Sequence, residues 1–501
     1  MKLEYILKSK LNFFIFLFSG FLLSFILPPY NYFFLGFVIF PFILYLLKKN
    51  QQADPRFFFI YGTLFAYGYF ISSLYWISYS LNFDQEVAIL KPLAIFFLPL
   101  GLSLFYGFGF YVLKRFCNFN HFFVLNFSIL MSLIEYFRSY ITGFSWNLFV
   151  YALSEQLESI QILNYIGTFG LNFLVIFLFS YPYFFLNKNK VIIVQRLFIL
   201  LIIISSNYLY GFNRLQINLK TINQQILLVQ PNENLLQINS NLNKYIESIL
   251  EISEPLNKSE NAIFLWPEGS YSFIKNKNLK KVFQDKFKNN QKIILGATTK
   301  DKNGNIFNSL VTLNSEGKII NNYNKMHLVP FGEFIPFEHT LKFLNLKKVT
   351  FGYQSFSRGK SREVLKINGN LVLPLVCYEV IDTGLLNISK KKFDIIFNIS
   401  EDAWFNRSIG TYQHYSHSIF RSIEEGKHIF RSTNQGISAS INPLGITLIS
   451  SSSNEKTVFS SNYQVLNNNT PFSILGNLMF LFLIFLFFLI QVSLKRYLKL
   501  L

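Results

Sequence analysis

The sequence predicts an α-helical membrane domain of about eight spans joined to an α/β domain outside the cytoplasm. About half of the 501 residues are hydrophobic, and long apolar runs crowd the first 211. A polar segment with short strand-like runs follows, and one more apolar run lies near the C-terminus. We therefore predict a transmembrane domain over 1–211, an extracytoplasmic domain over 212–468, and a C-terminal transmembrane helix with a short cytoplasmic tail over 469–501.

Eight apolar runs have the length of a membrane-spanning helix, which needs about 20 residues to cross about 30 Å of hydrocarbon. The predicted spans cover about 11–28, 31–47, 57–79, 88–113, 121–138, 161–186, 191–211 and 472–493. Residues 138–160 contain "GFSWNLFVYAL", which is typical of a partly buried re-entrant or interfacial stretch rather than a span.

The loops between these spans differ in charge. Basic residues follow the second and fourth spans, surround the turn between the sixth and seventh, and follow the last; they include Lys48, Lys114, Lys190 and Lys495. The intervening short loops carry almost none. The positive-inside rule then predicts that both termini are cytoplasmic. The protein would be a multi-pass protein of the bacterial inner membrane, with 212–468 in the periplasm.

The formal net charge of +19 narrows the class of partners. The segment 212–468 holds 30 Lys and Arg against 20 Asp and Glu. A basic domain beside a lipid bilayer is attracted to anionic headgroups. Nucleic acid is the other usual partner of a basic surface, but the sequence has no basic-aromatic nucleic-acid motif. We therefore expect a lipid bilayer, and no nucleic acid, as the partner.

The polar segment has the pattern of an α/β domain. Several of its strand-like runs are apolar throughout, as expected of strands that are buried on both faces. The predicted strands are 222–230, 262–266, 292–299, 309–314, 371–377, 394–400, 428–433 and 436–442. Helical patterns cover 234–253, 277–290 and 411–426, and "DKNGN" and "NSEGK" indicate hairpin turns.

Cys377 ends the apolar run "LVLPLVC", at the strand end where α/β sheets usually present their sites. A buried core cysteine is the ordinary interpretation. Exported domains, however, usually pair their cysteines. The only other cysteine, Cys117, is predicted on the cytoplasmic side and cannot be its partner. An unpaired thiol in an oxidising compartment is a candidate nucleophile.

A nucleophilic thiol needs a base and a group that stabilises an oxyanion. None of the five histidines of the segment stands in a recognisable Cys–His setting. His414 and His417 have i, i+3 spacing, but no carboxylate or thiol lies near them at ligand spacing, so we predict no metal site. Glu268, after the apolar run "AIFLW", could be the base instead. Lys325 could lower the pKa of a nearby thiol.

Taken together, "WPE" (266–268), "KMHLVPFGE" (325–333) and "CYE" (377–379) resemble the nitrilase superfamily, which has a Glu–Lys–Cys triad on an α-β-β-α sandwich. "SLIEYFRSYITGFSWN" (132–147) and "GTFGLNFLV" (167–175), with eight spans around such a domain, resemble the apolipoprotein N-acyltransferases. That resemblance covers nearly the full chain.

The resemblance implies Cys377 as the nucleophile, Glu268 as the general base and Lys325 as the group that stabilises the tetrahedral intermediate. It implies supporting roles for four further residues: Glu333, Tyr378, Glu379 and Trp404. Three positions depart from the family pattern, because Ser145 replaces a usual proline, Glu401 a usual asparagine and Asn406 a usual glycine. These departures bear on local loop shape and not on the triad.

The implied reaction is phospholipid-dependent N-acylation of the N-terminal diacylglyceryl-cysteine of apolipoproteins, the last step of lipoprotein maturation. It would pass through a cysteine thioester and use no cofactor. The alternative is a membrane-tethered nitrilase-type amidase that hydrolyses a small amide, because the triad alone does not separate hydrolysis from transfer. The apolar stretch 334–356 could be a lid that contacts lipid, or ordinary core and surface helix.

A transporter or receptor with an outer binding domain is the third possibility. Its spans should hold paired charges or broken helices. Glu135 and Arg138 are the main candidates for such a pair. The intact triad motifs in the outer domain count against this class.

Overall fold

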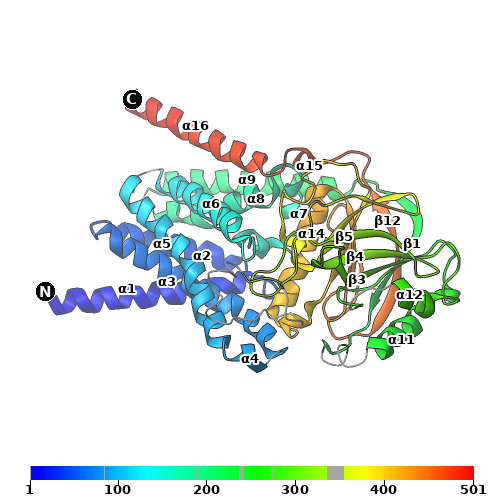
Figure 1. Ribbon diagram of the computed structural model, residues 1–501. Coiled ribbons are helices and arrows are strands. Elements are labelled where there is room, and N and C mark those ends of the chain that lie inside the picture. Colours follow the sequence, from blue (N-terminus) through cyan, green and yellow to red (C-terminus); the bar gives the residue numbers. More distant parts are fainter. Residues whose placement is uncertain are drawn as a thin grey trace. The chain divides into compact units, whose positions relative to one another are not determined.

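A helix lies in each of the eight ranges for which a span is predicted (Figure 1). The computed structural model describes residues 2–83, 85–120, 122–186, 189–235, 238, 242–271, 276–335 and 355–500. The eight helices are α1 (Lys2–Leu23), α2 (Phe34–Lys49), α3 (Pro55–Leu74), α5 (Leu98–Phe116), α6 (Phe123–Thr142), α8 (Leu163–Ser180), α9 (Lys190–Leu215) and α16 (Leu478–Leu500).

Two compact units divide the chain. The first consists of Met1–Ser78, Lys91–Ile217 and Thr470–Leu501, and the second of Tyr79–Leu90 and Asn218–Asn469. The first unit holds the long helices. Within the described residues, five helical stretches are long and apolar enough to cross a membrane: Pro55–Phe83, Leu93–Phe116, Leu163–Leu186, Lys190–Leu215 and Leu478–Arg496. Several apolar helices are therefore confirmed, whereas the count of eight spans stays a prediction.

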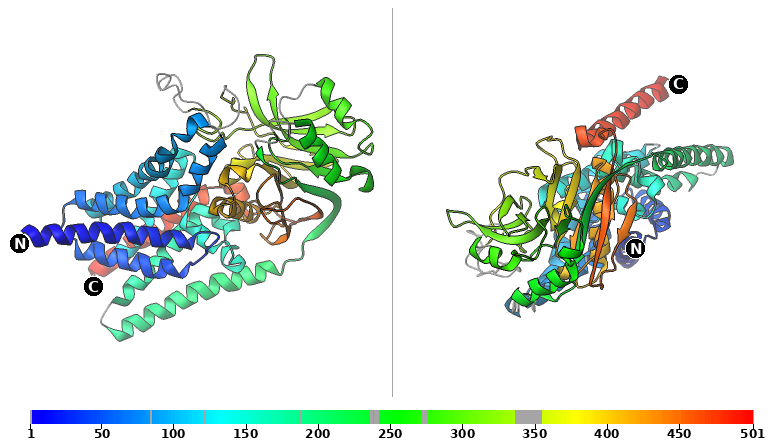
Figure 2. Two further views of the ribbon diagram at one scale, coloured as in Figure 1. Left: turned by 90° about the horizontal axis from the view of Figure 1, so that it is seen from below. Right: turned by 90° about the vertical axis from the view of Figure 1, so that its right-hand side faces the viewer.

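Glycines allow the first and third helices to pack closely. A Cβ atom on Gly20 would lie 1.7 Å from the carbonyl oxygen of Phe65, and one on Gly68 would lie 2.0 Å from that of Leu17. Small residues at such crossings are typical of helices packed within a membrane. In contrast, α9, the long green helix at the lower edge of Figure 2 (left), buries few of its residues.

The charged pair in the helical unit has a structural partner. Arg138 and Glu135 are fully buried, and Nη2 of Arg138 lies 2.5 Å from Oε2 of Glu135. Arg138 also donates hydrogen bonds to the carbonyls of Phe144 and Trp146, in the non-helical stretch after α6. Since these contacts fix the backbone of that stretch, the pair supports the fold rather than a transport path.

Two six-stranded sheets form the second unit. In the first, the strand order is β12 (Thr457–Val465), β1 (Lys220–Gln230), β2 (Ile263–Leu265), β3 (Lys292–Lys300), β4 (Ile306–Asn314) and β5 (Ile319–Asn324). In the second, the order is β11 (Thr447–Ser450), β10 (Ala439–Ile441), β9 (His428–Thr433), β8 (Ile395–Ser400), β7 (Asn370–Val376) and β6 (Leu365–Ile367). The strands β1 to β3 are parallel, as are β7 to β9.

Alternate side chains of a strand point to opposite faces of its sheet. Both faces of the first sheet are apolar, so one packs against helices and the other against the second sheet. Leu227 and Val229 of β1 pack with the helices α11 (Leu242–Ser253) and α12 (Asn276–Phe283) on the outer face. Ile226 and Leu228 of the same strand pack toward β7 and β8 of the second sheet. The helix α14 (Ile409–Glu425) packs on β9 and β10. The predicted α/β fold with two sheets is therefore confirmed.

The eight predicted strands correspond to interior strands, and the four strands that the sequence does not reveal, β5, β6, β11 and β12, are the four sheet edges. Edge strands are half exposed, so they lack the continuous apolar run of a buried strand. Most of the proposed lid, 334–356, lies outside the described residues, which omit 336–354.

Candidate active site

Three strand ends bring the predicted triad together. Glu268 follows β2 and Lys325 follows β5 in the first sheet, whereas Cys377 follows β7 in the second. All three side chains are buried. The chain around Glu268 requires a glycine on β3, because a Cβ atom on Gly296 would lie 2.4 Å from the Cα of Glu268. The two stacked sheets thus hold a base candidate and a thiol candidate in one place.

Glu268 and Glu333 share the cation Lys325. Nζ of Lys325 lies 3.5 Å from Oε1 of Glu268 and 3.0 Å from Oε1 of Glu333. Asn308, on β4, reinforces the arrangement, since its amide nitrogen donates to the same two oxygens at 2.7 and 2.6 Å. The remaining oxygen of Glu333 accepts from the backbone of Val329. Every group of this cluster is therefore held by at least two partners.

Cys377 is placed by a strained backbone. Its φ is +50°, in the left-handed region that is uncommon for residues other than glycine. The thiol lies close enough to Glu268 and to Ser400 of β8 for both groups to act on its pKa. Backbone strain at a reactive side chain is a frequent feature of functional sites. The turn from β7 into the following short helix thus aims the sulfur at the carboxylate of Glu268.

Burial and charge set the protonation of the triad. Burial raises the pKa of Cys377, the charge of Glu268 raises it further, and Lys325 partly offsets them. The pKa of Glu268 is also raised, chiefly by burial, although Lys325 opposes this. Burial alone would lower the pKa of Lys325, but the charges of Glu333 and Glu268 outweigh it, so the lysine stays charged. A neutral thiol beside a carboxylate is a nucleophile with its base in place.

Glu379 is a buried structural anion. Its Oε1 accepts from the Tyr323 hydroxyl at 2.6 Å and from Arg362 Nη2 at 2.9 Å, and its Oε2 accepts from the backbone of Val376 at 2.8 Å. Burial raises the pKa of Glu379, but Arg362 outweighs this effect and the net shift is downward. Because Val376 directly precedes Cys377, this carboxylate fixes the turn that carries the thiol.

The two aromatic residues among the predicted site residues, Tyr378 and Trp404, each pack against another ring. Tyr378 packs edge-on against His327, with ring centroids 4.9 Å apart. Trp404 packs edge-on against Phe83, with centroids 4.8 Å apart. Phe83 belongs to the segment Tyr79–Leu90, which joins the α/β unit although helices of the other unit flank it in sequence. The α/β unit therefore includes a short segment from the N-terminal half of the chain.

A second buried cluster lies next to the thiol, and the sequence does not reveal it. Asp402 accepts from Arg431 Nη2 at 2.7 Å and from the Ser400 hydroxyl at 2.7 Å, and its Oδ1 lies 2.9 Å from Nδ1 of His414. Burial raises the pKa of Asp402, but Arg431 and His414 lower it to about 2. Burial and Arg431 lower the pKa of His414, which keeps the imidazole neutral.

This second cluster has the residue types of a metal site. The ligand atoms of Cys377, Asp402 and His414 all lie within 4.8 Å of one another. However, Nη2 of Arg431 is 2.7 Å from Asp402 and 3.0 Å from His414, so a guanidinium takes the place of a cation between them. The donor set therefore fits a hydrogen-bond network. The sequence draws attention to His417, which lies three residues after His414 on the same helix. The carboxylate that contacts His414 is Asp402, which lies outside that helix.

At two positions where the sequence departs from the family pattern, the residue that is present fits the local backbone conformation. Asn406 has a φ of +48°, a conformation in which asparagine is the usual substitute for glycine. Glu401 donates its backbone N–H to Glu268 at 3.1 Å. Its carboxyl caps the next short helix through Ala403 N and accepts from Asn434. An asparagine could make the same cap, so both replacements are compatible with the family geometry.

Sequence motifs therefore locate the seven predicted site residues, and the structure clusters Glu268, Lys325, Glu333 and Cys377 directly. The motifs do not reveal the residues that hold them: Asn308, Tyr323, Arg362, Asp402, His414 and Arg431. The available signal was polarity inside buried strands, as in "IFNSL" and "HIFRST". Such residues rarely stay buried without partners.

Comparison with known proteins places both parts of the chain. The family described as apolipoprotein N-acyltransferase N-terminal domain matches residues 19–181, and the carbon-nitrogen hydrolase family matches residues 228–465. An apolipoprotein N-acyltransferase of Rhizobium leguminosarum bv. trifolii is 31% identical over 447 residues, which are 84% of each chain. One of Rickettsia prowazekii is 30% identical over 81% of this chain and 83% of its own.

Solved structures match about half of the chain. A carbon-nitrogen hydrolase from Helicobacter pylori covers 48% of this chain and 88% of its own, with 16% identity and a TM-score of 0.35. The sequence relatives carry the assignment, since they align across both the helical part and the α/β part. On that evidence the chain is a member of the apolipoprotein N-acyltransferase family.

Proposed function

We propose that the chain transfers a fatty acyl group from a membrane phospholipid to an apolipoprotein through a thioester on Cys377. Membership of the family makes the chain an acyltransferase of lipoprotein N-acylation. The observation that supports the thioester route is the buried Cys377 thiol next to the carboxylate of Glu268, with Lys325 beside both. The roles of these residues are part of the proposal.

In the first step, Glu268 accepts the thiol proton as the sulfur attacks the ester carbonyl of the phospholipid. Lys325 stabilises the negative charge that develops on the carbonyl oxygen. When the intermediate collapses, the ester C–O bond breaks and Glu268 returns its proton to the leaving alkoxide. The products of this step are a thioester and a lysophospholipid.

In the second step, the α-amine of a diacylglyceryl-cysteine attacks the thioester. Glu268 accepts a proton from the attacking amine, the C–S bond breaks, and that proton returns to the sulfur. The products are an N-acylated lipoprotein and the free thiol. A thioester suits this route because amines attack it readily, and water, the competing acceptor, must be excluded.

The supporting residues act through position and charge in this proposal. Glu333 holds Lys325 together with Glu268, and Glu379 fixes the backbone before the nucleophile. Tyr378 and Trp404 provide aromatic surface near the thiol. We propose no cofactor, because each step moves only protons and an acyl group among these side chains.

The membrane arrangement is also part of the proposal. The chain is a membrane protein, and we propose eight spans with both termini in the cytoplasm of the bacterial inner membrane. Residues 1–211 and 469–501 would form the membrane part, and 212–468 the periplasmic catalytic domain. Only a few residues separate α9, which ends at Leu215, from β1, which begins at Lys220. Such short connections tether the domain to the bilayer that supplies its lipid substrates.

Intact-protein mass spectrometry tests the thioester. Purified protein incubated with phospholipid should gain the mass of one acyl chain, and neutral hydroxylamine should remove it. Cys377→Ala should gain none, whereas Cys117→Ser should behave as the wild type. A diacylated lipopeptide should release the adduct as a triacylated product. Turnover of simple amides without any acyl adduct would contradict the proposal and favour the tethered amidase.

A further inference from the structure

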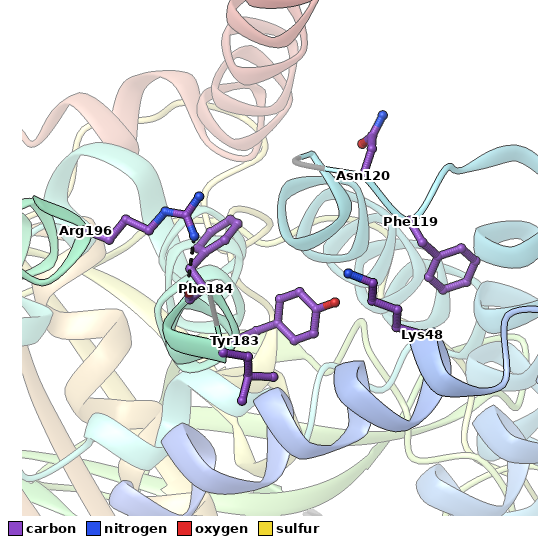
Figure 3. Close-up of a pocket in the computed structure, with 7 residues that line it drawn as sticks. Lys48, Phe119, Asn120, Tyr183, Phe184 and Arg196 are labelled. Carbon is purple, nitrogen blue, oxygen red and sulfur yellow. Dashed lines mark hydrogen bonds between the residues drawn. The ribbon is translucent and has the colours of Figure 1, made fainter. Parts of the chain in front are cut away.

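A cavity of about 380 Å³ opens in the helical unit (Figure 3). It shares no residue with the Cys377 site. Its walls come from the end of α2, the connection between α5 and α6, the short helix Tyr181–Leu186, and the second turn of α9. The lining residues are Lys48, Phe119, Asn120, Tyr183, Phe184, Leu186 and Arg196. Cavities of this volume are large enough for a small ligand or a headgroup.

The charges that line the cavity are all positive. Among the described residues that line it, Lys48 and Arg196 are the charged ones, and none is a carboxylate. Among the ion pairs of the described residues, none involves either side chain. Two cations that share a cavity without a counter-charge repel each other unless an anion lies between them. The cavity therefore has the electrostatics of an anion site.

The two cations contact aromatic rings and a backbone carbonyl of the cavity wall. Arg196 Nη1 donates to the carbonyl of Phe184 at 2.9 Å, and the guanidinium lies 4.9 Å from the centre of the Phe184 ring. The Tyr181 hydroxyl donates to the carbonyl of Arg196. Figure 3 shows the ammonium of Lys48 and the ring of Tyr183 pointing toward each other. Since one N–H group of Arg196 is used by Phe184, its other donors remain for a ligand.

Neutral donors complete the set. The side-chain oxygen of Asn120 accepts from the backbone N–H of Phe122 at 3.0 Å, which leaves the amide NH₂ as a donor. Tyr183 adds a hydroxyl. Lysine, arginine, amide and hydroxyl donors around one cavity match the acceptor oxygens of a phosphate. A carboxylate would use fewer of them.

Apolar surface continues from the cavity along α9. Leu186 is exposed, and so are Ile199 and Ile203, which follow Arg196 at i+3 and i+7 on the same face of the helix. A ligand with a phosphate in the cavity could thus lay an apolar chain against α9. Basic pockets between membrane helices bind anionic lipid headgroups in this way.

We propose that the cavity binds the phosphate of an anionic phospholipid as a bound lipid that is not the acyl donor. The lipid would join α2, the Tyr181–Leu186 helix and α9 at one end of the helical unit. By charge, that end is the one predicted to face the cytoplasm. The proposal goes beyond the acyl transfer at Cys377 and stands whether or not that mechanism holds.

Native mass spectrometry of the full chain in detergent tests the site, with phosphatidylglycerol as the probe. We compare Lys48→Ala, Arg196→Ala and the double variant with matched controls, Lys49→Ala at the same helix end and Arg115→Ala. Each lost cation should weaken phosphatidylglycerol binding about fivefold, and the double variant about 20-fold or more. The controls should bind as the wild type. Lys48→Glu, a charge reversal at an exposed side chain, should weaken binding further without affecting folding.

Two further probes identify the source of the phosphate. Phosphatidylcholine, which has no net charge, should bind at least tenfold more weakly than phosphatidylglycerol, since only the latter leaves a net charge for the two cations. Inorganic phosphate at millimolar concentration should not displace the lipid. Displacement by inorganic phosphate would overturn the lipid assignment in favour of a soluble anion. Equal binding of phosphatidylglycerol to wild type and the double variant would overturn the site altogether.

Discussion

Asp402 and Arg431 form a fully buried ion pair, with Oδ2 2.7 Å from Nη2, beside the thiol that the sequence identifies as the nucleophile. The thiol therefore lies near two carboxylates, those of Glu268 and Asp402. Both raise the pKa of Cys377, and Lys325 lowers it. The reactivity of the sulfur should thus respond in opposite directions to changes at Asp402 and at Lys325.

Asp402→Asn should lower the pKa of Cys377, because the substitution removes a negative charge that opposes the thiolate. The rate of iodoacetamide alkylation, measured against pH, should rise at a lower pH than in the wild type. The variant should also be destabilised by about 3–5 kcal/mol, since Arg431 keeps a buried charge without its partner. Glu316→Gln, an exposed change on the turn after β4, is the control. An unshifted alkylation profile would show that Asp402 only supports the fold.

Lys325→Met should shift the same profile the other way. The substitution removes the positive charge that favours the thiolate, so alkylation should require a higher pH. Acyl transfer should fall by about 10²–10³-fold, as it does when an oxyanion donor is lost. Lys318→Met changes an exposed lysine on the same hairpin and should leave both measurements unchanged. A profile that moves to lower pH would contradict the assignment of Lys325.

The sequence predicts the interior of the fold better than its edges. The strands of the sheet centres, such as β3 and β8, are apolar and were predictable. The edge strand β12, "TVFSSNYQV", is polar and half exposed, so its strand character depends on pairing with β1 and not on its own composition. Pairing between segments more than 200 residues apart leaves no local signal in one sequence.

The candidate site also has a part that the sequence predicts and a part that it does not. Glu268, Lys325 and Cys377 lie in spaced motifs and could be predicted, whereas the network around Asp402 could not. His414 illustrates the reason, because i, i+3 spacing directs attention to His417, but the carboxylate partner, Asp402, comes from the short helix Asp402–Phe405 that precedes α14. Helical spacing identifies neighbours on one element. It does not identify neighbours that tertiary packing brings together.

Asn308→Ala tests the bridge between the two glutamates. The lost hydrogen bond lowers the pKa of Glu268 in the wild type, so its removal should raise that pKa further. The substitution removes the hydrogen bonds to both Glu268 and Glu333. The acidic limb of kcat/KM should move to higher pH, and the rate should fall about tenfold to a hundredfold for the lost charge-assisted hydrogen bond to Glu268. Asn303→Ala, in the exposed loop before β4, should change neither. A lower rate with an unmoved acidic limb would refute the bridge.

Glu401 should make stability depend on pH. Burial raises the pKa of this carboxyl to about 8, although Ala403 N–H and Asn434 oppose the rise; Glu268 and Asp402 are its charged neighbours. The folded state then holds a proton that the unfolded state loses above its ordinary pKa of about 4.5. The stabilisation is complete below about pH 4.5 and is lost as pH rises toward 8.

Glu401→Gln should remove this dependence. The apparent Tm of the wild type should fall relative to that of the variant between pH 5 and pH 8, as followed by intrinsic fluorescence. Glu455→Gln, on an exposed turn, should track the wild type at each pH. Parallel Tm curves for Glu401→Gln and the wild type would show that Glu401 titrates normally.

Gly296→Ala tests how closely β3 supports the base. The added Cβ atom would lie 2.4 Å from the Cα of Glu268, a contact with backbone that no side-chain rotation can relieve. Glu268 must then shift, and a shift of about 1 Å in a catalytic group costs about 10²-fold in rate. Stability should fall by only about 1–3 kcal/mol, as for other overpacked sites. In the control, Gly101→Ala, the new Cβ meets no atom within 4 Å. Full acyl transfer by Gly296→Ala would mean that the base does not depend on this contact, because a displaced Glu268 could not accept the thiol proton.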